Sequence, residues 1–214
     1  MYTITKVNSN VKKEMAVSVN DKPVLAVSEY TSYKQAGNYY LYGRIEEETI
    51  KPVIEWIFDE NYRNKHTHLN LIITSQGGAV IDCFALLDAM EGSYIPVNTL
   101  GMGQIASCGL IIFLAGQNRV LTQNTQVLSH QWSGGNYGKG HELLAGRKIE
   151  DWLTDKLNNY YAEKTGLSLN FIKKNLLPES DVYLTPEEAL KYNICTEIRG
   201  RKWQPKEQKK SKSK

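Results

Sequence analysis

The chain has 214 residues, 41% of them hydrophobic and 23% charged, which is the composition of an ordinary soluble protein with one sizeable core. A formal net charge of +3 is too small to indicate a nucleic-acid-binding protein, and the lysine-rich residues 206–214 are expected to form a solvated, disordered end. The longest apolar run, residues 109–115, is too short for a membrane span, and we expect no signal peptide. The three widely spaced cysteines fit neither a disulfide framework nor a zinc site, which favours a reducing, cytoplasmic compartment.

Strands and helices are predicted to alternate along most of the chain. Residues 1–38 are polar and irregular, with a weak strand signal at 24–27. The elements predicted after them are a strand at 38–43, a helix near 46–61, a strand at 69–74, a helix at 79–90, a strand at 96–100, a helix at 107–115, a strand at 125–130, a helix at about 142–164 ended by Gly166, and a helix begun by the capping box at 185–188. Residues 75–78 and 101–106 are predicted to be turns of small residues. This alternation indicates an α/β domain.

Residues 101–109 (GMGQIASCG) carry the strongest chemical signal. Small residues lead the chain from a strand end into a buried helix, so Ser107 falls in the first helical turn, where backbone N–H groups lack intrahelical partners. A hydroxyl there can attack a carbonyl carbon while the N–H of Cys108 faces the developing oxyanion. The alternative is that Ser107 only caps the helix. An α/β-hydrolase elbow is disfavoured, because Ile105 stands where the first glycine of G-x-S-x-G would be.

Two further features favour a catalytic serine. The glycine pair at 77–78 ends the neighbouring strand and can offer a second N–H without side-chain obstruction. His130 ends an apolar strand and is a candidate general base for the serine. A triad also needs a carboxylate beside the histidine, and the spacing alone leaves Asp181, Glu179 and Asp151 open.

Five segments resemble, in order, the signature segments of the ClpP family, the proteolytic subunits of the Clp protease. They are Gly77–Gly78, residues 102–109 (MGQIASCG), residues 129–131 (SHQ), Gly134–Gly135 and residues 181–190 (DVYLTPEEAL). The resemblance runs from about Tyr39 to Ile198 and implies a crotonase-like α/β fold of repeated β-β-α units. It implies three parts: a divergent segment at 1–38, a peptidase domain at 39–200 with a protruding strand–helix handle at about 131–166, and a basic tail at 201–214.

The same resemblance implies a serine endopeptidase that works through an acyl-enzyme, without a cofactor or metal. Ser107 would be the nucleophile, His130 the general base and Asp181 the residue that orients the histidine, with the N–H groups of Gly78 and Cys108 as the oxyanion hole. Unfolded or extended polypeptide substrates would be bound with the help of Gly77, Gly134 and Gly135, by pairing with the glycine-rich strand. The family also implies a cytoplasmic homo-oligomer of two stacked heptameric rings around a chamber, with neither nucleic acid nor membrane as partner.

The chain departs from the family pattern at several positions. Gln76 and Trp132 stand where prolines are usual, and neither change touches a reacting group. The strand that offers aromatic side chains to the AAA+ unfoldase carries Asn70 and Ile72 instead, and Gly92 stands where an aromatic residue is common. These changes predict weak or absent coupling to a standard unfoldase.

Three other functions stay open. A dedicated viral or processing protease of the same fold is favoured by the altered docking positions. The second is an acyl-CoA hydratase or isomerase, which would share the fold but needs no Ser–His–Asp triad. The third is a non-catalytic ring subunit, which would typically have lost a triad residue. The complete set of triad residues argues against both. His66 and His68 alternate at a strand entrance without further ligands, so we expect surface residues and no metal site.

Overall fold

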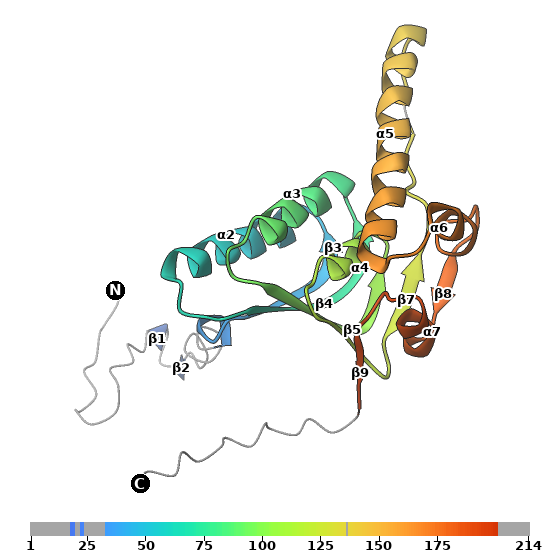
Figure 1. Ribbon diagram of the computed structural model, residues 1–214. Coiled ribbons are helices and arrows are strands. Elements are labelled where there is room, and N and C mark those ends of the chain that lie inside the picture. Colours follow the sequence, from blue (N-terminus) through green and yellow to red (C-terminus); the bar gives the residue numbers. More distant parts are fainter. Residues whose placement is uncertain (1–17, 20–21, 24–32, 136, 201–214) are drawn as a thin grey trace, which may run out of the picture.

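A computed structural model describes residues 18–19, 22–23, 33–135 and 137–200. Most of the described chain forms one largely parallel sheet with helices against it (Figure 1). The elements in chain order are β1 (Ser18–Val19), β2 (Lys22–Pro23), β3 (Asn38–Ile45), α2 (Glu47–Arg63), β4 (Leu69–Gly78), α3 (Val80–Glu91), β5 (Val97–Ala106), α4 (Cys108–Leu114), β6 (Arg119–Thr122), β7 (Gln126–Ser129), α5 (Gly140–Thr165), α6 (Leu169–Asn175), β8 (Val182–Leu184), α7 (Pro186–Lys191) and β9 (Glu197–Arg199). The fold is the mixed α/β arrangement that the sequence predicted.

The sheet divides at β5. Its strands run in the order β3-β4-β5-β6-β9, all parallel. The first half of β5 pairs with β6, through Thr99–Gly101 and residues 119–121. The second half pairs with β7, through Gln104–Ala106 and residues 126–128, and β7 in turn pairs antiparallel with β8. The carboxyl end of β5 therefore lies beside β7 and close to the β7–β8 pair.

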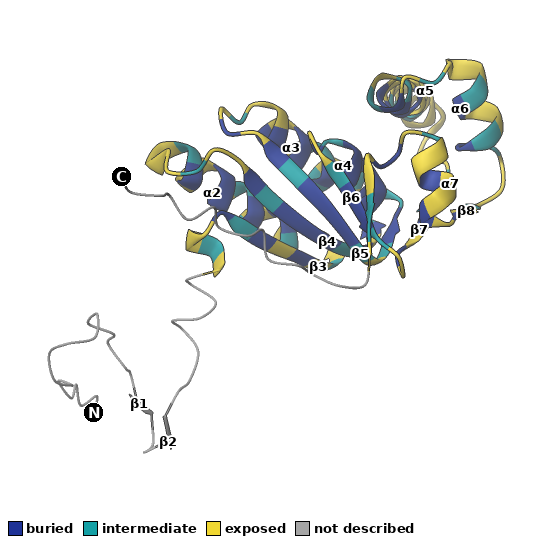
Figure 2. Ribbon diagram, turned by 60° about the horizontal axis from the view of Figure 1, so that its bottom comes forward, coloured by how far each residue is buried: buried dark blue, intermediate teal, exposed yellow. Residues whose placement is uncertain are grey.

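Helices cover one face of this sheet. In Figure 2, α2, α3 and α4 lie against the same side of the strands, and the strands and helices are dark where they meet. Every residue of α4, from Cys108 to Leu114, is buried, which explains the uninterrupted apolar run at 109–115. Among the described helices, none is long and apolar enough to cross a membrane.

The two predicted turns of small residues are strands. Residues 75–78 and 101–106 continue β4 and β5, because each has a parallel partner: Gly77 pairs with Arg44, and Ile105 pairs with Ser75. Glycine clusters are typical of turns, but here ladder hydrogen bonds to neighbouring strands hold an extended backbone. The helices that follow begin at Val80 and Cys108, one residue later than predicted.

The later helices match the prediction closely. α5 ends at Gly166, which adopts a left-handed conformation with φ 73°, the conformation that favours glycine after a helix. The capping box before α7 is formed, since Thr185 Oγ1 accepts the Glu188 N–H at 3.2 Å and Glu188 Oε2 accepts the Thr185 N–H at 2.8 Å. The sequence pattern did not reveal β6, α6, β8 or β9.

Helix α5 projects away from the rest of the molecule (Figure 1). Leu144, Ile149 and Trp152 along it are more than half exposed. The glycine-rich strand expected before α5 is not formed: in the described residues between Gln131 and Lys139 there is no strand. A strand needs a neighbouring edge to bond with, and this segment has none within the described chain.

Some sequence-based expectations lie outside the described residues. These are the weak strand signal at 24–27 and the basic end at 206–214. Within residues 1–38 the described part holds β1 and β2, which pair antiparallel apart from the main sheet. The division into segments 1–38, 39–200 and 201–214 stays a prediction.

Candidate active site

Ser107 joins β5 to α4 in a conformation that is rare for its residue type. Its φ is 54° and its ψ is −126°, so it has a positive φ without being glycine. Its backbone is held on both sides: the N–H donates to the Leu128 carbonyl at 3.0 Å, and the carbonyl accepts from Leu110 and Ile111 at 2.9 and 3.1 Å. Its side chain makes no capping hydrogen bond to α4. The hydroxyl is therefore not used as a helix cap, and it stays available to a substrate.

The glycine pair at the end of β4 packs directly against this serine. A methyl group on Gly77, which has φ 93°, would lie 2.6 Å from Ser107 Cβ and 3.1 Å from the Cys108 nitrogen. A methyl group on Gly78 would collide with the carbonyl oxygen of Ile45. Glycine at position 77 lets β4 approach the start of α4 so closely, and glycine at position 78 lets β4 approach the end of β3.

Ser75 holds the glycine pair in place, and the sequence did not single it out. Its side chain is 1% exposed, and its Oγ accepts the Gly77 N–H at 3.0 Å. Gly109 of α4 packs against the other side of it, where an added methyl would lie 3.0 Å from Ser75 Cβ. The sequence did hold a signal for Ser75, because it is a polar residue at the end of the apolar run of β4. A hydroxyl buried there needs a hydrogen-bond partner.

Two buried thiols connect the same segments. The Cys108 thiol donates to the Gly78 carbonyl at 3.2 Å, and the Cys83 thiol of α3 donates to the Cys108 carbonyl at 3.6 Å. Hydrogen bonding with Cys83 lowers the pKa of Cys108, and the same contact raises the pKa of Cys83. The thiol of Cys108 is thus bound to the backbone of Gly78. The two residues expected to supply the oxyanion hole are therefore in direct contact.

Strand register brings the histidine and the carboxylate to the same region. Ala106 pairs with Leu128, so Ser107 follows β5 at the level where Ser129 ends β7. Ser129 and Val182 form the last pair of the antiparallel β7–β8 ladder, and His130 and Asp181 are the residues directly beyond that pair.

This register bears on the three carboxylates that the sequence left open. Asp181 is exposed and directly precedes β8, so it lies at the His130 end of the β7–β8 ladder, whereas Glu179 lies two residues further from the ladder and Asp151 is exposed on α5. Among the described residues, no hydrogen bond joins the side chains of Ser107, His130 and Asp181. Catalytic hydrogen bonds are often long in the absence of substrate, so this geometry does not exclude a triad.

The remaining predicted substrate-binding glycines lie nearby in sequence but outside any strand. Gly134 and Gly135 are exposed in the segment that follows His130. A methyl on Gly134 would lie 2.8 Å from the ring of Trp132, whereas Gly135 has open space around it. Their backbone groups face solvent in the single chain, as an edge that pairs with an extended peptide requires.

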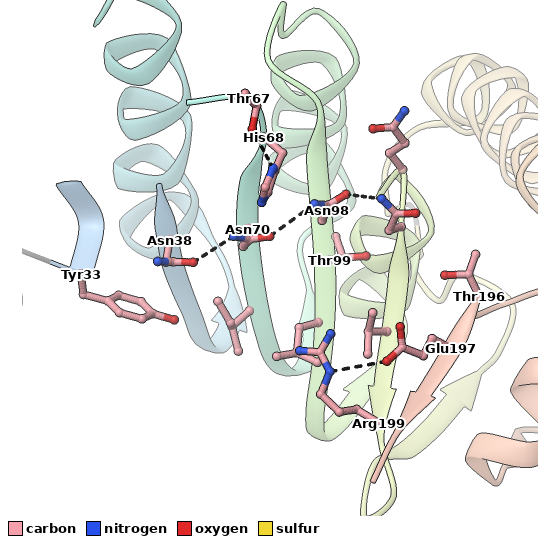
Figure 3. Close-up of a pocket in the computed structure, with 15 residues that line it drawn as sticks. Tyr33, Asn38, Thr67, His68, Asn70, Asn98, Thr99, Thr196, Glu197 and Arg199 are labelled. Atoms are coloured by element: carbon pink, nitrogen blue, oxygen red, sulfur yellow. Dashed lines mark hydrogen bonds and ion pairs between the residues drawn. The ribbon is translucent and has the colours of Figure 1, made fainter. Parts of the chain in front are cut away.

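A separate hollow of about 840 Å³ lies on the sheet face opposite the helices (Figure 3). A row of asparagines crosses its upper part. Their amides form a ladder: Asn70 Nδ2 donates to Asn38 Oδ1 at 3.0 Å, Asn98 to Asn70 at 3.3 Å, and Asn118 to Asn98 at 2.9 Å. Two residues further along the strands, the floor becomes apolar through Ile72, Leu100 and Val120.

The positions expected to matter for unfoldase docking are only partly in this hollow. Asn70 and Ile72 line it, and Asn70 is held at the centre of the amide ladder. Gly92 ends α3 and does not line the hollow. His68 lies at its rim, where its Nδ1 is 3.1 Å from Thr67 Oγ1 (Figure 3).

His68 is exposed, as expected, whereas His66 is only partly exposed. Its side chain is 23% exposed, and its Nε2 lies 3.2 Å from Oε2 of the buried Glu60 and 3.0 Å from the Gln35 carbonyl. The ring also packs on Gly37, where a methyl would lie 3.1 Å away. His66 is thus a structural contact between the end of α2 and the chain that enters β3. In the described part of the chain, no group of three metal-binding side chains occurs.

Residues 25–202 match the family model described as Clp protease. The match contains every element from β3 to β9 and every candidate active-site residue.

Proposed function

The chain belongs to the Clp protease family, and from this premise we propose that it is a serine endopeptidase with Ser107 as its nucleophile. The observation that carries the proposal is the state of Ser107 itself. A positive φ at a non-glycine residue costs roughly 1–3 kcal/mol, and such strain gathers at functional sites. The side chain makes no helix cap that would account for a serine here.

The proposed reaction follows the Ser–His–Asp scheme. Ser107 Oγ attacks the scissile carbonyl carbon as His130 accepts its proton, and Asp181 stabilises the resulting imidazolium. The N–H groups of Gly78 and Cys108 bind the oxyanion. His130 then protonates the leaving amine, the C–N bond breaks, and an acyl-enzyme remains. Water, deprotonated by the same histidine, hydrolyses that ester and restores the serine.

The proposed substrate is an extended polypeptide. Backbone groups around Gly134 and Gly135 would pair with it as an added strand, while Gly77 leaves room beside the nucleophile. The alternative of an acyl-CoA hydratase or isomerase needs no Ser–His–Asp set, and so does not account for His130 and Asp181 at the same end of the β7–β8 ladder. A non-catalytic ring subunit does not account for the strain at Ser107.

We further propose that the chain acts in a homo-oligomeric, ring-shaped chamber, as two stacked heptameric rings. Support comes from α5, whose Leu144, Ile149 and Trp152 expose apolar surface on a helix that stands away from the main body. Exposed apolar surface of this kind is typical of protein–protein contacts.

A dedicated processing protease is the second candidate, and the hollow on the sheet favours it. A partner that inserts apolar or aromatic side chains near Asn70 would have to bury amides already bonded in a ladder. Each amide has hydrogen-bonding capacity beyond its ladder bonds, and apolar side chains would leave that capacity unsatisfied at a cost of roughly 1–3 kcal/mol per group. Coupling to a standard AAA+ unfoldase is therefore expected to be weak.

A fluorophosphonate probe followed by intact-mass measurement tests the nucleophile. Wild-type protein should gain the mass of one probe per chain, and Ser107→Ala should gain none. The matched control is Ser168→Ala, because Ser168 does cap a helix, through a hydrogen bond from the Phe171 N–H at 3.3 Å. That variant should lose about 1 kcal/mol of stability and still take the label. A probe that reacts equally with Ser107→Ala would refute the proposal.

A further inference from the structure

Both sequence neighbours of His130 are hydrogen-bonded to the same turn of the molecule. The His130 ring has no hydrogen-bond partner among the described residues, so its own side chain does not hold it in place. Ser129 and Gln131 do have partners, and those partners are consecutive carbonyl groups at the end of α6, on Leu176 and Leu177.

The Ser129 contact is short and wholly buried. Its side chain is 0% exposed, and its Oγ donates to the Leu176 carbonyl at 2.6 Å. The Tyr161 phenol oxygen lies 3.1 Å from the same Oγ. Tyr161 is itself buried, and burial raises the pKa of its phenol, which keeps it uncharged.

The Gln131 contact completes the arrangement from the other side. Its Nε2 donates to the Leu177 carbonyl at 3.0 Å. Leu176 and Leu177 both bond back to Ile172 through their N–H groups, so the two carbonyls belong to a fixed helix end. Only three residues then separate Leu177 from Asp181, which, like His130, lies directly beyond the last pair of the β7–β8 ladder.

We propose that Ser129 and Gln131 are positioning residues that hold the backbone of His130 against the segment leading to Asp181. The proposal rests on the assignment of His130 as general base. Alternation along β7 supports it: Ser129 points into the core toward α5 and α6, so His130 points to the opposite, partly exposed face. Anchoring the two flanking side chains fixes the direction of the imidazole without occupying either ring nitrogen.

Ser129→Ala and Gln131→Met test this role with a fluorogenic peptide substrate. Each variant removes one donor to the α6 end and leaves Ser107, His130 and Asp181 intact. We expect kcat to fall about tenfold to a hundredfold with KM unchanged, because small misplacements of a catalytic group are that costly.

Thr125→Val is the matched control. Thr125 lies at the other end of β7, is 2% exposed, and donates its hydroxyl to the Gly101 carbonyl at 2.9 Å. Thr125→Val loses a buried hydrogen bond from a side-chain hydroxyl to a backbone carbonyl, as Ser129→Ala does, but at the end of β7 away from His130. We expect its thermal stability to fall while its kcat and pH profile stay those of the wild type.

The outcomes separate this proposal from the proposed function. A wild type that neither takes the fluorophosphonate label nor cleaves peptides would refute the function itself. If the wild type is active and Gln131→Met has the same kcat and KM, the positioning role is overturned. That result can be obtained even if Ser129→Ala does not fold, because the Gln131 side chain lies near the surface.

Discussion

Gly77→Ala is the substitution for which the structure predicts the most specific loss. The added methyl would lie 2.6 Å from Ser107 Cβ and 2.9 Å from the Ala106 carbonyl oxygen. Ordinary contact begins at 3.4 Å, so either β4 or Ser107 must move by about 0.8 Å. A shift of about 1 Å at a catalytic group can lower activity about a hundredfold. The positive φ of 93° adds about 1–2 kcal/mol of backbone strain for alanine.

Gly43→Ala is the matched control, because it introduces backbone strain without a steric collision. Gly43 has φ 104°, close to that of Gly77, but an added methyl there meets nothing within 4 Å. Urea unfolding should show a loss of about 1–2 kcal/mol for both variants. Peptide hydrolysis should fall about a hundredfold only for Gly77→Ala. Equal kcat/KM values for the two alanine variants would refute the inference that the glycine pair sets the position of the nucleophile.

Three other predictions concern pH, assembly and partner. Hydrolysis should fall as the pH drops through the range about 5 to 8, because a protonated His130 cannot accept the serine proton, and a flat kcat/KM profile would count against this base. Leu144→Asp on α5 should lower the native mass below that of a ring. Tyr94→Asp, an equally drastic change at an exposed loop site, should leave the native mass unchanged. A full ring formed by Leu144→Asp would contradict the role given to α5. ATP-dependent degradation of a folded, tagged substrate with a bacterial Clp ATPase should be weak and should increase in Asn70→Tyr, because anchor aromatics dominate such interfaces. Robust degradation by the wild type would show that the amide ladder does not impair docking.

The sequence alone determined the elements whose signals are local. The apolar spacing, the left-handed stop at Gly166 and the capping box at Thr185 depend on residues within a few positions of one another, and the helices they predict are present. The small-residue segment before Ser107 and the histidine at a strand end likewise pointed to a serine peptidase, and the family match supports that class of function.

Tertiary structure decided the features that depend on residues far apart in the chain. The glycine segments at 75–78 and 101–106 look like turns locally, and they are strands because their hydrogen-bond partners lie on other strands. The side-chain contacts of Ser75 and Ser129 join elements more than 30 residues apart, and no local pattern encodes them.

The same limit applies to the choice among the carboxylates and to the state of Ser107. Spacing could not separate Asp181 from Glu179 or Asp151, whereas the register of β7 with β8 leaves Asp181 and His130 at the same end of that ladder. The positive φ of Ser107 is imposed by hydrogen bonds from both sides of its backbone and by the close approach of β4. Local propensity opposes that conformation for serine, so only the packing of the whole sheet can hold it.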